Sequence, residues 1–167
     1  MAVVKGELTS QDTDGWSTLM NCASSHIYLK QMNRKCESAL ENGAEPVRVL
    51  SSVLGQNYPS DELEYSWKKL MQNHPHDSIC CCSVDEVQDE MATRFNKSKQ
   101  VADYLVSEGK RYIADKINTK EYEKYKNALP FVVFNTAGRE RTSVVSVEID
   151  VTRKSVSYTH LTLPTIR

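Results

Sequence analysis

The chain has 167 residues with a net charge of −1, and its lysines and arginines are scattered rather than gathered in a stripe. This balance argues against a nucleic-acid partner. No stretch approaches the roughly 18 apolar residues of a membrane-spanning helix, and the first residues lack the apolar centre of a signal peptide, so we expect no membrane partner. Five cysteines, three of them adjacent, do not suit a disulfide framework and favour a reducing cytoplasm.

Helical periodicity begins at Trp16, where apolar residues start to recur at steps of three and four. Gly43 is expected to end this first helix, because glycine is common just past a helix C-terminus. A short helix should then open at Pro46, since proline is tolerated in a first turn, and stop at Gly55.

Two further helices are predicted on either side of a proline. Ser60 is a suitable N-cap for a helix over 57–73, and Pro75 should end that helix because the residue before a proline avoids helical geometry. A long helix is expected to follow at once, since Ser83 and the glutamate three residues later have the spacing of a capping box. Gly109, inside this helix, should cost about 1 kcal/mol relative to alanine.

Strand character replaces the helical pattern after Pro130. The segments FVVFN (131–135) and SVVSVEID (143–150) predict the two strands of a hairpin around the turn TAGRE. One hairpin cannot bury a core alone, so the rest of its sheet is expected to lie outside this chain. The fold class predicted is mainly α, an antiparallel three-helix bundle followed by a C-terminal β-hairpin.

The C-terminal tail does not continue this pattern. VSYTHLTLPT (156–165) matches an in-frame translation of a transposon end and adapter used in preparing sequencing libraries. Such a fusion scar is left out of reasoning about fold, so Tyr158 and His160 carry no functional weight. We expect the natural gene to have been cut short here.

The densest group of reactive side chains is NHPHDSICCCS, residues 73–83. A zinc site is one interpretation, although its Cys-x-Cys spacing is tighter than structural zinc sites usually have; the ligands would be His74, His76, Cys80 and Cys82. A reactive thiol near a helix start is another, but the segment contains no Cys-x-x-Cys. A third is that the cysteines pack as small apolar side chains at a helix junction.

His76 and Asp77 need a separate interpretation. Pro75 releases them from helical geometry, so both can point into a cleft. His76 could then be one ligand of a metal held mainly by other residues, and Asp77 could orient it or contact a substrate. The alternative is that the two side chains only cap helix ends, and the residues alone leave this choice open.

Three stretches resemble one enzyme family in the expected order. LMQNHPHDSICCCSVDEVQDEM (70–91) resembles the signature of glycoside hydrolase family 38, the zinc-dependent retaining α-mannosidases, and is closest to a bacterial branch with HPHDSICGCSVDEV. Residues 6–37 resemble the segment that leads from the catalytic into the helical domain, and 129–149 resemble the start of a β-sandwich. The implied domains are 1–14, the end of an α/β catalytic domain; 15–128, a helical middle domain; 129–154, the start of a truncated β-sandwich; and 155–167, the adapter-derived tail.

The resemblance also implies a chemistry. In that family a zinc ion binds two sugar hydroxyls, an aspartate is the nucleophile and a second carboxylate is the acid/base. The family's His-Asp pair corresponds to His76, a zinc ligand, and Asp77, a hydrogen-bond partner of the bound mannose. The catalytic residues and the other zinc ligands are expected upstream of Met1. The chain alone should therefore be inactive, with a catalytic domain as its partner in cis and an α-mannoside or phosphomannosyl compound as substrate.

Two positions depart from the family pattern, and a third is uncertain in role. Cys81 replaces a glycine, which is costly if the backbone there needs a positive φ or a close approach; the alternative is that this cysteine is a sequencing error. His26 stands where the family favours arginine and lacks the permanent charge of arginine; its plainer interpretation is a half-buried helix residue. Glu7 can line the cleft or lie on the surface. The competing functions are a freestanding helical binding module without catalysis and, from the cysteines alone, a redox or zinc-structural protein.

Overall fold

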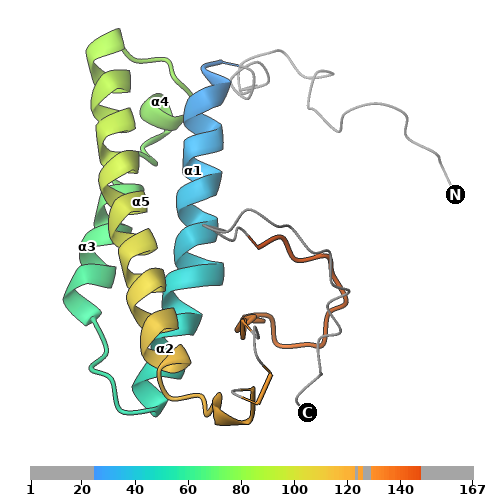
Figure 1. The fold of residues 1–167 in the computed structure, drawn as a ribbon. Helices are drawn as coiled ribbons and strands as arrows, with labels where there is room; N and C mark the ends of the chain where they lie inside the picture. Colours follow the sequence, from blue (N-terminus) through green and yellow to red (C-terminus); the bar gives the residue numbers. More distant parts are fainter. Residues whose placement is uncertain (1–24, 123, 126–128, 148–167) are drawn as a thin grey trace, which may run out of the picture.

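The computed structural model describes residues 25–122, 124–125 and 129–147, and long helices dominate this part of the chain (Figure 1). A helical rod, made of α1, a π-helical turn and α2, runs along one side. The next long helix, α3, runs in the opposite direction, and the longest helix, α5, packs beside both. The elements are α1 (Ile27–Ala39), a π-helical turn (Leu40–Ala44), α2 (Glu45–Val53), α3 (Ser60–Met71), α4 (His76–Ile79), α5 (Asp85–Ala114) and a 3₁₀ turn (Lys120–Tyr122). The mainly α class is thus confirmed. None of the described helices is long and apolar enough to cross a membrane.

The core forms where α5 packs against α1, α2 and α3. On α5 the buried side chains recur at steps of three and four, as the sequence pattern predicted, and place Phe95 and Met91 at zero exposure. Each large apolar side chain buried in this way stabilises the fold by about 1.5–3 kcal/mol. The hydrophobic core cluster of buried side chains consists of Leu29, Cys36, Leu40, Ala44, Leu63, Leu70, Met91, Phe95, Ala102 and Leu105.

The prediction that Gly43 ends the first helix is wrong. The chain continues through the π-helical turn directly into α2, and the predicted short helix is confirmed, with Pro46 in its first turn. A Cβ added to Gly43 would lie 3.0 Å from Val106 Cγ2, so this glycine lets the π-helical turn approach α5. Gly55, with φ +98°, follows the end of α2 as predicted.

Gly109 has a tertiary role that its helix propensity did not indicate. A Cβ there would lie 2.7 Å from Val47 Cγ1 and 3.1 Å from Arg48 Cδ. These distances are too short for unstrained contacts, so alanine is not the favourable alternative that its intrinsic propensity suggests. At Gly109, α2 and α5 approach so closely that a β-carbon has no room.

Both predicted N-caps lie in the wrong register. Ser60 is the first residue of α3 and Pro59 occupies its N-cap position, while α5 begins after Val84 in extended conformation. Neither helix has a side-chain cap hydrogen bond. Because α5 starts two residues beyond Ser83, the serine hydroxyl is out of register with the first-turn amides. Its carbonyl accepts from Gln88 Nε2 at 3.0 Å instead.

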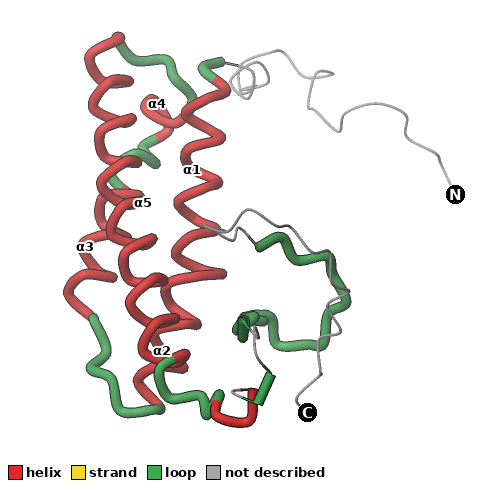
Figure 2. Tube along the Cα trace, in the orientation of Figure 1, coloured by secondary structure: helices red, strands yellow, loops and turns green. Residues whose placement is uncertain are grey.

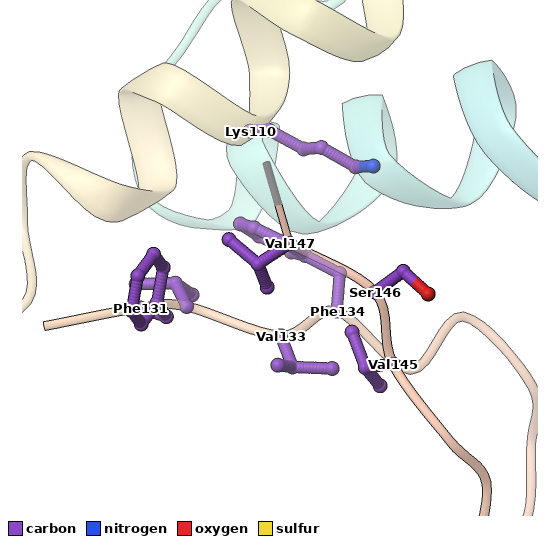
Figure 3. A pocket seen from close by; sticks show the side chains of 8 residues that line it. Lys110, Phe131, Val133, Phe134, Val145, Ser146 and Val147 are labelled. Carbon is purple, nitrogen blue, oxygen red and sulfur yellow. The ribbon is translucent and has the colours of Figure 1, made fainter. Parts of the chain in front are cut away.

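The C-terminal hairpin is not confirmed, because residues 129–147, which we call the arm, contain no strand (Figure 2). Its two predicted strand segments nevertheless face one another around a cavity of about 510 Å³ beside Lys110 of α5 (Figure 3). Two strands without a sheet to cover them are marginal, which explains an approach without a ladder. Residues 148–150 of the second segment, and the predicted catalytic-domain end and tail, lie outside the described residues.

Candidate functional site

Residues 73–83, which we call the motif turn, connect α3 to α5 and include α4. The segment starts from a fixed point, because Asn73 has zero exposure and its Nδ2 donates to the Met91 carbonyl on α5 at 3.2 Å. A buried amide that bonds another helix ties the two elements together. The motif turn therefore leaves α3 from a position that is fixed relative to α5.

The next residue, His74, bonds to α1. Its Nε2 lies 2.7 Å from Asn33 Oδ1, and Asn33 Nδ2 donates to Glu37 Oε1 at 2.8 Å. Because the Asn33 amide nitrogen serves Glu37, its oxygen accepts from His74, and Nε2 of His74 carries the proton. This relay of carboxylate, amide and imidazole joins α1 to the start of the motif turn.

The short helix α4 ends in a Schellman motif. The Cys82 amide donates to the Asp77 carbonyl at 3.1 Å and the Cys81 amide to the Ser78 carbonyl at 2.9 Å. Cys81, between them, has φ +63°, the left-handed conformation usually reserved for glycine at this position. The sequence-based concern about Cys81 is confirmed: the backbone there has the positive φ for which a β-carbon is costly, by about 1 kcal/mol or more.

Side-chain contacts keep this turn in place despite the strain. Lys30 Nζ on α1 donates to Cys81 Sγ at 3.1 Å and to the Ser25 carbonyl at 2.6 Å. Ile79 and Cys81 also pack against the edge of the hydrophobic core. The prediction that the cysteines pack at a helix junction thus holds in part for Cys81, whereas Cys82 is exposed.

His76 and Asp77 are the first two residues of α4 and point to solvent. Their side chains are 82% and 73% exposed, and His76 Nε2 lies 3.3 Å from Asp77 Oδ1. Neither caps a helix: α4 has no side-chain cap hydrogen bond, and its N-cap residue is Pro75. The structure brings the two together as one imidazole and one carboxylate on an open surface, which can serve a metal or sugar only together with groups from elsewhere.

No four-ligand zinc site forms within the motif turn. The described part of the chain contains no group of three or more His, Cys, Asp or Glu side chains arranged to hold a metal. His74 is instead engaged by Asn33. His76, by contrast, lies on the open surface beside Asp77, with 82% of its side chain exposed.

Comparison with known proteins identifies the family. Residues 17–113, more than half of the chain, match the model of the α-mannosidase middle domain. The chain belongs to that family. The matched range runs from before α1 to the penultimate residue of α5. It includes the motif turn with His76 and Asp77.

Longer relatives place this middle domain within glycoside hydrolase family 38. A protein of Halalkalibacterium halodurans, provisionally named a mannosylglycerate hydrolase, is 47% identical over 142 residues, which are 85% of this chain and 15% of the relative. The crystal structure of an Enterococcus faecalis α-mannosidase is 51% identical with a TM-score of 0.63, over 70% of this chain and 13% of that one. A family 38 protein from Enterococcus faecalis is 46% identical with a TM-score of 0.59, over 61% and 12%. The chain thus spans about a seventh of the length of these relatives.

Two other positions singled out from the sequence lie apart from the motif turn or outside the description. His26 is exposed and not a half-buried helix residue: it is the N-cap of α1, with φ 43°, and its Nδ1 lies 3.1 Å from Ser25 Oγ. That prediction was wrong because the helix begins at Ile27. Glu7 lies outside the described residues.

The sequence analysis missed the two α1 residues that hold the motif turn, Lys30 and Asn33. Asn33 offered a signal, because it is a polar residue at a stripe position between Leu29 and Cys36, which are both buried. A polar side chain in an apolar stripe needs a partner, and here the partner is His74. Lys30 offered no comparable signal.

Proposed function

We propose that this middle domain serves a zinc-dependent family 38 glycoside hydrolase that cleaves α-mannosidic bonds with retention. The observation that carries this proposal is the exposed, adjacent pair of His76 and Asp77 on a turn held by α1 and α5. His76 would supply a single imidazole ligand to zinc, and Asp77 would accept hydrogen bonds from hydroxyls of the sugar. Zinc bound there would act as a Lewis acid that also orients the sugar.

The nucleophile, the acid/base and the remaining zinc ligands would come from a catalytic domain in the same polypeptide. The chain spans 15% of the length of its curated relative, which leaves ample room for that domain. Both side chains face solvent in this segment, so a neighbouring domain can reach them without rearranging α4. The relatives are named for α-mannosides and for mannosylglycerate, so the proposed substrate is an α-mannoside or a charged mannosyl compound, hydrolysed in the cytoplasm.

The test is a chimera in which residues 15–128 replace the matching segment of the Enterococcus faecalis α-mannosidase. His76→Ala should lose most of the bound zinc and of the α-mannoside hydrolysis. Asp77→Asn should keep the zinc and lower kcat/KM about 100-fold, since it weakens contacts to the sugar in the transition state. Asn96→Ala, at an exposed asparagine of α5, is the control and should change neither. Full zinc content and activity in His76→Ala would refute the proposed role.

A further inference from the structure

The junction between α1 and α2 contains a backbone carbonyl, that of Asn42, which cannot accept the regular α-helical hydrogen bond. In a regular α-helix the amide of residue 46 would donate to the carbonyl of residue 42. Residue 46 is a proline, which has no N–H and whose ring crowds that carbonyl. The chain widens into the π-helical turn Leu40–Ala44 just before this proline, and the Asn42 carbonyl lacks the donor that a regular α-helix would give it.

A residue far along the chain provides that donor. Thr136 Oγ1, on the arm, donates to the Asn42 carbonyl at 2.7 Å across 94 positions of sequence. The arm makes a second contact two residues earlier, where Lys110 Nζ of α5 lies 5.6 Å from the centroid of the Phe134 ring. Figure 3 shows Lys110 reaching from α5 over the arm, beside Phe134.

We propose that the Asn42 carbonyl, opened by Pro46, is a docking point for the segment that follows the helical domain. The hydroxyl of Thr136 takes the place of the missing amide, and the Lys110–Phe134 contact fixes the direction in which the arm leaves. Gly43 contributes by allowing the turn to sit against Val106 of α5, the helix that also carries Lys110. These two contacts, which we call the lock, join the arm to the helical domain in addition to the covalent connection between them. They do not depend on any role of His76.

A double-mutant cycle on the full chain tests this lock. The docked population of the arm is measured by NMR from the ring-current shift that Phe134 imposes on the Lys110 side-chain protons, followed over a temperature series. Thr136→Val should lower the ratio of docked to undocked arm about five-fold, the effect of one hydrogen bond. In the Pro46→Ala background residue 46 regains its amide, the carbonyl has its own donor, and Thr136→Val should have less than about a two-fold effect.

Two controls make the result decisive. Thr142→Val, at an exposed threonine of the same arm, should leave the ratio unchanged, and circular dichroism should show the helices intact in every variant. The lock is refuted if the Lys110 protons show no ring-current shift in the original chain, or if Thr136→Val has the same effect with proline and with alanine at position 46. Equal effects of Thr136→Val and Thr142→Val would refute it as well.

Discussion

The motif turn and the arm both lie outside the long helices, but they are held by different kinds of contact. The motif turn has its own backbone hydrogen bonds and a fully buried side chain, Asn73, at its start. The arm forms no ladder in the described residues, and its valines stay exposed, with Val144 at 95%. A connection thus holds one conformation when it buries an anchor and satisfies its own backbone, and it depends on neighbours when it does neither.

The largest effect is expected at the buried anchor of the motif turn. Asn73→Ala should lower the free energy of unfolding by about 2 kcal/mol, because it removes a buried hydrogen bond to α5 and leaves a small cavity. Chemical denaturation measures this loss, with Asn96→Ala, at an exposed asparagine of α5, as the control. A loss no larger than that of the control would mean that the motif turn is not anchored as described.

A stabilising change is expected at the strained position. Cys81→Gly should raise the free energy of unfolding by about 1 kcal/mol, because glycine adopts φ +63° without a steric penalty. The adjacent Cys82→Gly is the matched control and should instead destabilise, since glycine increases the conformational entropy of the unfolded chain. If both substitutions destabilise equally, the contacts of Cys81 with Lys30 and the core outweigh its backbone strain.

A smaller, local effect is expected on α1. Asn33→Ala breaks the bond to His74 and should reduce the free energy of unfolding by about 0.5 kcal/mol, because the site is partly exposed. Hydrogen exchange should show faster opening of the Cys80 and Cys82 amides, which close α4, with little change in the core of α5. Asn42→Ala, at an exposed asparagine on the same rod, should leave α4 exchange unaltered. Unchanged exchange at α4 in Asn33→Ala would show that the hydrogen bond from α1 does not hold the motif turn in place.

The smallest effect is expected in the arm. Val144→Ser should change the free energy of unfolding by less than about 0.5 kcal/mol, because this side chain buries almost nothing in the present chain. Thermal unfolding followed by circular dichroism measures it. A loss above about 1 kcal/mol would show that the arm packs as tightly as the motif turn and would erase the difference between the two regions.

The sequence predicted the helical elements well and their ends less well. Apolar spacing identified the buried face of α5, and Pro75 and Gly55 marked real boundaries, because these signals are local. Gly43 and Ser83 misled, since the same residues that suit a C-terminus or a cap also suit a close approach of two helices or a loop. Which use applies depends on residues about 60 positions away, such as Val106 beside Gly43.

The sequence by itself determined that this chain is a mainly helical member of the α-mannosidase middle-domain family, because the motif is written in consecutive residues. It also marked Cys81 as costly if the backbone φ were positive there, and the structure supplied that φ of +63°. The tertiary structure alone decided that His74 bonds to Asn33, that His76 and Asp77 face solvent, and that Thr136 serves the Asn42 carbonyl. Each of these three features depends on how helices that are distant in the sequence pack together. No local sequence pattern encodes the distance between two side chains that meet only after the core has formed.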